Sequence, residues 1–441
     1  MNHTATPDLA ATLIAENFSR DATGVLHVGG LPLTALADTY GTPLFVYDAD
    51  GLRRAYRALK QAVAGFAEVD YSVKANPNPA VIRVFHAEGA GAEIASGAEF
   101  DAAMQAGVPP EKILFAGPGK SAADLDRVIG GGIGEIHLEN REELCRVAAA
   151  AERHGTTVRV ALRINPGATA QGGAMRMGGK PSPFGFDEED LSEAVDAVEA
   201  EPRLHLVGLH LFAGTQGLKA ETLLGQWAYG LDLAAQIARK IARPLETIDL
   251  GGGLGIPYFS GDATLDLNAL RAGLPPLIET VSTNPLLAGA RVVLEPGRYL
   301  AGPAGVYLAR VLAVKVSRGS RFVITDGGMH HHLAASGNLG QIVKRDFPLV
   351  AVSGGEGSRP APCRGRSVPP RRARPRGDAA DAGRGRSRRG AAIGRLWAHG
   401  QPDRLPEPSA PRRSAGGRGT SRVDPVTGRL SRAPSLSPPR K

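Results

Sequence analysis

Short runs rich in apolar and β-branched residues recur between Thr42 and Tyr299, and longer stretches with helical spacing separate them. Buried parallel strands have this composition, and each needs a crossover helix before the next strand. So many repeats predict a (β/α)8 barrel rather than a doubly wound sheet. The expected strands are 44–48, 69–75, 91–96, 113–117, 135–140, 158–166, 206–214, 247–253 and 291–299.

The two flanks of this region have a different pattern, in which apolar and polar residues alternate. Segments 25–37 and 306–328 show it, and the second contains an SRGS turn at 317–320. Alternation with a period of two is typical of antiparallel strands that bury one face, so we expect the flanks to pair in one β domain. Within the barrel, the Gly-rich segment 167–186 is expected to be a functional loop.

The excess positive charge lies at one end of the chain. The whole sequence carries +8, but residues 353–441 hold 20 Arg and 1 Lys against 6 acidic residues, which leaves residues 1–352 mildly acidic. This tail is also rich in Pro, Gly and Ser, so its composition predicts disorder. Aromatic residues interleave with the basic ones only at Trp397, and we therefore expect no nucleic-acid partner.

These patterns divide the chain into four parts. They are an N-terminal segment with a β-domain strand (1–42), the barrel (43–299), a β-domain remnant (300–352) and a disordered tail (353–441). The 2 cysteines form neither a disulfide framework nor a zinc ligand set. An apolar run of about 18 residues does not occur, so we expect a cytoplasmic protein with no membrane partner.

Polar residues stand where the expected barrel strands end, and such positions face the active-site mouth. A buried lysine there is costly unless it has a partner or forms an imine, although a lone lysine at a strand end often extends into water. A single histidine is more often part of the core, and GGGLG resembles a phosphate loop more than a dinucleotide fingerprint. The residues found there are Lys74, Glu93, Arg163, His210, Gly251–Gly253, Glu295 and Arg298.

Three consecutive histidines, His330 to His332, have side chains that can bind metal. Adjacent residues of an extended chain point to alternate faces, and the nearby sequence has no carboxylate cluster. We therefore expect no metal site.

Six motifs together resemble one family, the fold-type III pyridoxal-5'-phosphate (PLP) decarboxylases, which include the ornithine, diaminopimelate and arginine decarboxylases. They are YSVKANPN, GAEIASGAE, ALRINP, GLHLFAGTQ, IDLGGGLG and EPGRY, in the family's order, and the likeness covers about residues 20–352. The resemblance implies that Lys74 binds PLP as a Schiff base, that His210 stacks on its ring and that Glu295 keeps the pyridine nitrogen protonated. The further cofactor-binding residues are Glu93, where the family often has Asp, together with Arg163, Gly214, Thr215, Gly253, Gly297 and Arg298.

The same resemblance implies a homodimeric amino-acid decarboxylase. Segment 325–348 lacks the Arg and Tyr of diaminopimelate decarboxylases and is most similar to the homologues that accompany exosortase gene clusters. Diaminopimelate is therefore a possible substrate but not the favoured one. An amino-acid racemase of the same cofactor class and an inactive regulatory homologue stay open as alternatives.

After Val352 the chain departs from this family, whose members continue with a CTPLD-like motif and an AYG tyrosine. Residues 393–408, IGRLWAHGQPDRLPEP, can be encoded by synonymous codons that read SGAYGLTASPIAFLS in the +1 frame. Codons from Asp381 onward can likewise give PGEVVAVV. We therefore expect that a frameshift produced the tail and removed the last strands of the β domain.

Overall fold

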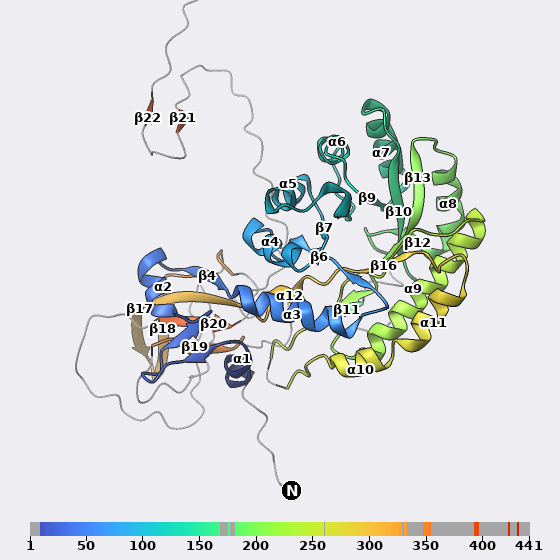
Figure 1. Ribbon diagram of the computed structural model, residues 1–441. Coiled ribbons are helices and arrows are strands. Elements are labelled where there is room, and N and C mark those ends of the chain that lie inside the picture. Colours follow the sequence, from blue (N-terminus) through green and yellow to red (C-terminus); the bar gives the residue numbers. More distant parts are fainter. Residues whose placement is uncertain are drawn as a thin grey trace, which may run out of the picture. The chain divides into compact units, whose positions relative to one another are not determined.

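The computed structural model describes residues 9–167, 175–176, 181–259, 261–328, 330–332, 347–353, 392–396, 422–423 and 430–431. Its largest sheet is parallel and runs in the order β5-β16-β15-β13-β10-β9-β8-β7-β6 (Figure 1). The two end strands, β5 (Glu68–Val69) and β6 (Tyr71–Ser72), are halves of one segment, so the sheet closes on itself as a barrel. The other strands are β7 (Ala92–Ile94), β8 (Ile113–Phe115), β9 (Glu135–Leu138), β10 (Val158–Asn165), β13 (Leu204–Leu211), β15 (Thr247–Asp249) and β16 (Arg291–Leu294).

Asp70 lies at the point where the barrel closes. Its backbone N–H donates to the carbonyl of Leu294 at 2.9 Å, and its buried carboxylate accepts bonds of 2.7 Å from the Gly91 N–H and from Arg291 Nη2. One residue thus connects the strands on both sides of the seam. The predicted (β/α)8 barrel is confirmed.

Helices surround the barrel on its outside (Figure 1). Several begin where an Asp, Asn or Ser side chain accepts a backbone N–H of the first turn, as at Asp48, Ser96 and Asn140. Their inner faces form one apolar core with the strands, which includes Trp227 and Phe85. The helices are α3 (Ala49–Ala62), α4 (Pro79–Ala87), α5 (Gly97–Ala106), α6 (Ala122–Gly130), α7 (Arg141–Arg153), α8 (Leu191–Glu199), α9 (Ala220–Ile241), α10 (Leu267–Ala272), α11 (Pro275–Thr283) and the short α12 (Arg298–Ala301).

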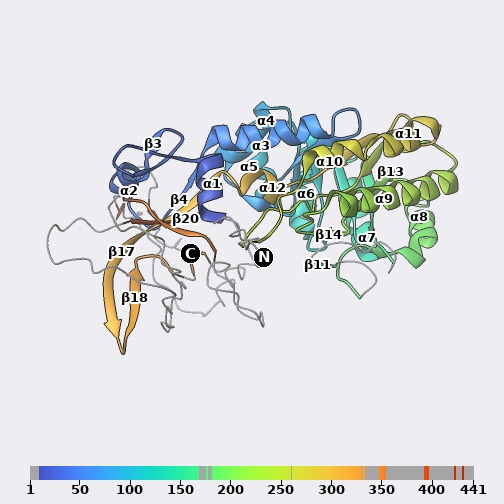
Figure 2. The ribbon, with the colours of Figure 1, turned by 90° about the horizontal axis from the view of Figure 1, so that it is seen from below.

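An antiparallel sheet is built around the long strand β17 (Gly305–Ser317), which pairs with β18 (Ser320–Thr325), β20 (Ala392–Leu396) and β4 (Leu44–Tyr47); β19 (Leu349–Ala351) pairs with β20. The predicted turn between β17 and β18 is confirmed, and Figure 2 shows the two strands as a long ribbon. The assignment of segment 44–48 to the barrel is wrong, because β4 pairs with β17. A short apolar run does not by itself distinguish a parallel from an antiparallel strand.

The N-terminal flank contains less β structure than its pattern predicts. It forms helix α1 (Leu9–Asn17), a small sheet of β1 (Ser19–Arg20), β2 (Leu26–Val28) and β3 (Leu31–Pro32), and then helix α2 (Leu33–Tyr40). The strand prediction is wrong from Leu33 onward, because Leu33 and Ala37 are spaced by one helical turn and bury the same helix face. This flank shares a second core with Val306 and Val352 of the other flank.

Strand β20 comes from the Arg-rich tail, whose composition did not predict it. Residues 402–441 form a separate unit with the strand pair β21 (Arg422–Val423) and β22 (Leu430–Ser431). Most of residues 353–441 lie outside the described residues, so the disorder and the frameshift stay predictions. Of the helices in the described part of the chain, none is both long and apolar enough to cross a membrane.

The remaining short elements lie in loops. They are β11 (Met175–Arg176), β12 (Phe186–Asp187), β14 (Gly214–Thr215) and the 3-10 turns Val73–Ala75, Pro110–Lys112 and Glu188–Asp190.

Candidate active site

Lys74 lies directly after β6, in the 3-10 turn Val73–Ala75 rather than in the strand that was predicted to continue to residue 75. Neighbouring strands set its surroundings, because Ser72 of β6 is in register with Glu93 of β7. Lys74 Nζ lies 2.7 Å from Glu93 Oε2, and Ser72 Oγ donates to the same oxygen at 2.5 Å. Glu93 is buried, whereas the Lys74 side chain is 37% exposed.

Two opposing effects act on the charge of Lys74. Burial alone would lower the pKa of this amine, but the charges of Glu93 and Glu295 outweigh burial and raise it. In the protein without cofactor Lys74 is therefore an ammonium group, which must lose a proton before it can act as a nucleophile.

His210 and Glu295 meet at the ends of β13 and β16. His210 Nε2 lies 3.3 Å from Glu295 Oε2, and both side chains are buried. Within the described part of the chain, neither His210 nitrogen nor Glu295 Oε1 has a hydrogen-bond partner of proper geometry. Burial lowers the pKa of His210 well below its usual range, and the neighbouring His137 adds to this effect, so His210 is neutral at physiological pH.

Arg163 is held by a carboxylate that the sequence analysis did not select. Its Nη1 donates to Glu139 Oε1 at 2.7 Å, and Glu139 also accepts the backbone N–H groups of Gly117 and Gly185. The guanidinium group lies 4.8 Å from the centre of the Phe184 ring. Glu139 follows β9 as Lys74 follows β6, so the same rule of strand ends identifies it.

The glycine loops after β13 and β15 pack backbone against backbone. Gly253 has a φ of +89°, and a Cβ atom there would lie 2.4 Å from the carbonyl oxygen of Gly214. The Gly217 N–H donates to the carbonyl of Gly253 at 2.8 Å. A Cβ on Gly297 would lie 2.8 Å from Ala75 Cβ, beside Lys74. Gly253 and Gly297 are therefore sites of close approach, where a side chain does not fit.

Arg298 and Thr215 belong to the same corner of the site. Arg298 Nη1 donates to Gln216 Oε1 at 3.0 Å, and its guanidinium group lies 5.4 Å from the centre of the Tyr258 ring. Sequence reasoning missed Gln216 and Tyr258. Gln216 directly follows a predicted residue, whereas nothing in the sequence around Tyr258 indicated it.

All of the residues predicted for the site thus stand at one end of the barrel. Glu93, Arg163 and His210 lie within β7, β10 and β13, and the others follow the carboxyl ends of their strands. His210 and Glu295 are accompanied there by two further buried residues, His137 and Asp249, and one ligand atom of each of the four lies within 4.8 Å of the others. Such a group could hold a metal ion, so the expectation of no metal stays a prediction. His330 to His332 are not part of it, and His332 packs against Phe45 and Tyr307.

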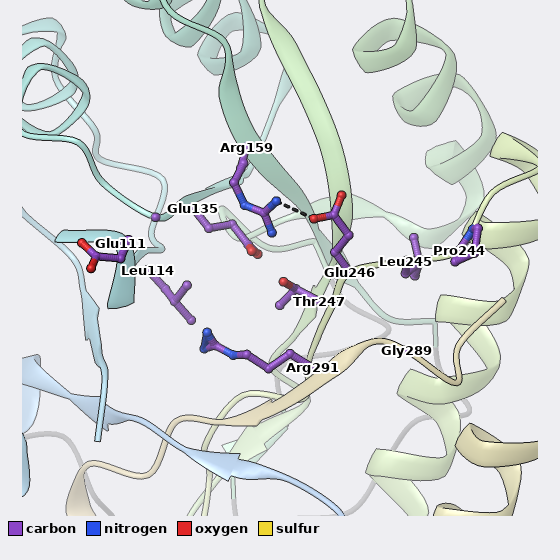
Figure 3. Close-up of a pocket in the computed structure, with 11 residues that line it drawn as sticks. Glu111, Leu114, Glu135, Arg159, Pro244, Leu245, Glu246, Thr247, Gly289 and Arg291 are labelled. Carbon is purple, nitrogen blue, oxygen red and sulfur yellow. Dashed lines mark hydrogen bonds and ion pairs between the residues drawn. The ribbon is translucent and has the colours of Figure 1, made fainter. Parts of the chain in front are cut away.

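A cavity of about 480 Å³ lies at the opposite end, where the strands begin (Figure 3). Its polar walls include Glu135, Arg159, Thr247 and Arg291, and Arg159 Nη1 lies 2.5 Å from Glu246 Oε2. Barrel enzymes carry their chemistry at the carboxyl ends of the strands, so this cavity is distinct from the candidate site.

Comparison with known proteins identifies the family. The model of the family described as "Pyridoxal-dependent decarboxylase, pyridoxal binding domain" matches residues 49–302. The L-glutamyl-(BtrI acyl-carrier protein) decarboxylase of Niallia circulans is 36% identical over 320 residues, which cover 73% of this chain and 74% of the relative. The diaminopimelate decarboxylase of Zymomonas mobilis is 35% identical over 318 residues, which cover 70% of this chain and 72% of the relative.

Solved structures agree with the architecture. The crystal structure of AQ1208 from Aquifex aeolicus superposes with a TM-score of 0.73 at 26% identity, over 88% of each chain. The diaminopimelate decarboxylase of Helicobacter pylori, solved with L-lysine, has a TM-score of 0.67 at 24% identity over 82% of this chain and 88% of that one, a likeness of fold alone. The matched domain, the similarity over most of the sequence and the shared barrel agree. The chain therefore belongs to the pyridoxal-dependent decarboxylases.

Proposed function

We propose that this chain decarboxylates an amino-acid substrate at the carboxyl end of the barrel, with PLP attached through Lys74. The observation that carries this assignment is the placement of a lysine with a partly exposed side chain at the same strand ends as a buried carboxylate, Glu295, whose Oε1 has no hydrogen-bond partner among the described residues. PLP, when bound, supplies an electron-poor ring that accepts the electron pair released when the α-carboxylate leaves as CO2.

The residues present fit this cofactor. Glu295 Oε1 is buried and lacks a donor within the described part of the chain, which suits the N–H of a protonated pyridine ring. His210 is neutral and buried, which suits contact with one face of an aromatic ring. Arg298 offers a cation beside the Gly214–Gly217 and Gly251–Gly253 loops, and backbone loops of this kind can bind a phosphate group.

Each side chain then has a stated task. Lys74 would hold the cofactor through its amine, whose position Glu93 and Ser72 fix. Glu295 would favour a protonated ring nitrogen. His210 would contact one face of the ring and so limit the return of a proton to the other face. Arg163, oriented by Glu139, adds a positive charge that acts on the pKa of Lys74 in the lowering direction.

The substrate class follows from the shared chemistry of the relatives. One relative acts on a glutamyl group carried by an acyl-carrier protein and others act on diaminopimelate, and both substrates carry an amino-acid head with a long polar remainder. We infer an α-amino acid or its carrier-bound derivative.

The test is to measure CO2 release from diaminopimelate, glutamate, ornithine, lysine, arginine and the pantetheine thioester of glutamate, with Lys74→Ala as the control. Release of CO2 with an equal amount of amine from one of them is expected, and none from the control. Exchange of the α-proton without CO2 would favour a racemase. Cofactor binding without any turnover would favour a regulatory homologue.

A homodimer and a cytoplasmic location are finer parts of this proposal. Leu312, Val314 and Val316 of β17 are 63%, 58% and 66% exposed, an apolar row that a complete β domain is expected to cover. Light scattering of a chain with a complete β domain should give twice the mass of one chain. The location is supported by cysteine usage alone.

A further inference from the structure

Asp249 is a fully buried acid at the end of β15 that has no task in the site as described so far. Its Oδ1 accepts the backbone N–H of Gly251 at 2.8 Å. Its Oδ2 and Glu295 Oε1 are both buried and lack an N–H or O–H donor within the described residues. One carboxyl oxygen of each side chain lies within 4.8 Å of the other, so the two groups adjoin and a small adjustment of either can join them by a hydrogen bond. Two carboxyl groups can make such a bond only if one of them carries a proton.

Two ionised carboxylates in this position would be unstable. Both are buried, so each charge would lack water, and like charges at close range repel. Burial raises the pKa of Asp249 well above its usual range, and the charge of Glu295 raises it further. The proton therefore resides on Asp249.

The groups around the pair do not offer Asp249 a cation. His137 Nε2 lies 3.9 Å from Asp249 Oδ2 but only 3.2 Å from Glu135 Oε1 on the side of the Figure 3 cavity. His210 is held neutral by burial. Lys74 interacts with the charge of Glu295, but its amine is consumed when the cofactor is attached. With the cofactor attached, the charge of Glu295 is then stabilised only by a neutral hydrogen-bond donor on one side and by the cofactor ring on the other.

We propose that Asp249 is a positioning residue that stays protonated and donates a hydrogen bond to Glu295, which keeps Glu295 a carboxylate opposite the pyridine nitrogen of PLP. The proposal rests on the role of Glu295 given above. A hydrogen bond to the charged form of an acid favours that form. Without it, the charge of Glu295 is less well stabilised, so Glu295 is a poorer partner for a protonated ring nitrogen and the ring a poorer acceptor of electrons.

Two substitutions separate this role from a merely structural one. In Asp249→Asn the amide oxygen can keep the bond from the Gly251 N–H, which places the amide N–H group where Oδ2 faces Glu295. The donor is thereby preserved. Asp249→Ala removes it. Asp70→Asn is the matched control, because Asp70 is another buried acid of raised pKa whose partners are Gly91 and Arg291.

The measurement is the ¹⁵N chemical shift of PLP labelled at the ring nitrogen, bound to the full chain, together with kcat and the melting temperature. The parent, Asp249→Asn and Asp70→Asn should show a protonated ring nitrogen. Asp249→Ala should show a shift toward neutral pyridine and a kcat lower by about 10- to 100-fold, the usual effect of a hydrogen bond to a charged group. A protonated nitrogen in Asp249→Ala, or an Asp249→Asn that behaves like Asp249→Ala, would overturn the proposal.

Glu295→Gln distinguishes this failure from that of the proposed function. If Glu295→Gln also leaves the ring nitrogen protonated, the role of Glu295 itself is wrong. If Glu295→Gln changes the shift and Asp249→Ala does not, only the role of Asp249 is wrong. Metal analysis of the same samples tests whether His137, His210, Asp249 and Glu295 bind a metal ion instead. Stoichiometric zinc that is retained beside PLP would also overturn the proposal.

Discussion

Glu93 sets the charge state of the amine on which the whole site depends. Its carboxylate is the nearest ionic partner of Lys74 and holds the pKa of that amine above its usual value. Glu93→Gln should lower this pKa, because burial, which acts in the other direction, remains. The neutral fraction of Lys74 at pH 7 rises accordingly, so covalent cofactor attachment should be about 10-fold faster or more.

Borohydride trapping of attached PLP at several pH values measures this rate. The rate in the parent should rise steeply with pH, and Glu93→Gln should reach the same rate at lower pH. Glu246→Gln, which changes a carboxylate at the far end of the barrel, is the control. Slower attachment in Glu93→Gln would mean that Glu93 instead takes up the Lys74 proton during the reaction.

Glu295 and Arg298 should fail in different ways when they are altered. Glu295→Gln should leave the PLP dissociation constant within a few fold and lower kcat by orders of magnitude, because the ring nitrogen loses its partner. Arg298→Ala should weaken PLP binding by about 10-fold or more, because it removes a charge-assisted contact with phosphate. Equilibrium dialysis and initial rates at saturating PLP separate the two effects. Equal activity of Glu295→Gln and the parent would remove Glu295 from the mechanism.

At the level of elements, the loop after β15 packs its backbone directly against the backbone of the loop after β13. Gly253→Ala would force a Cβ to within 2.4 Å of the Gly214 carbonyl at a φ of +89°. Gly261→Ala is matched, since Gly261 has a φ of +95° but no atom near the added carbon. The conformational cost of about 1–2 kcal/mol is common to both. Gly253→Ala should therefore unfold at lower denaturant concentration than Gly261→Ala and bind PLP more weakly, and equal values for the two would contradict the close packing.

The barrel strands and the site at their ends could be predicted from sequence because both follow local rules. Buried parallel strands form apolar runs, and functional residues stand at or after their carboxyl ends, as His210 and Lys74 do. Local rules fail where the structure of a segment depends on the element that it packs against. The run at 44–47 looks like a barrel strand but pairs with β17, and segment 33–40 is helical because its apolar residues fit a tertiary face. Asp249 was missed because its role arises from an acid 46 positions away in the chain, Glu295.

At the scale of the molecule, the apolar row on β17 is exposed, and we attribute its exposure to the β-domain strands that the tail replaces. A chain whose frame is restored after codon 352 is expected to gain the missing β-domain strands, which would cover Leu312, Val314 and Val316. It should retain PLP through gel filtration better than the present chain, form a dimer and release CO2 faster. Side-by-side expression of the two versions tests this. Full activity and dimerisation of the chain as written would show that the tail is its natural end.

Strand β20 is the segment of the tail that pairs with the β domain. Its backbone pairs with five residues of β17 and three of β19, so it connects two strands that otherwise have no shared ladder. A chain ending after Leu396 should therefore keep the melting temperature of the full chain, whereas one ending after Ser353 should melt roughly 5 °C lower or more, because those backbone hydrogen bonds are lost. Calorimetry of the three lengths makes the comparison, and PLP dissociation constants show whether the loss reaches the barrel. Identical melting temperatures for the two truncations would mean that β20 adds no stability and that the sheet depends on β4, β17 and β18 alone.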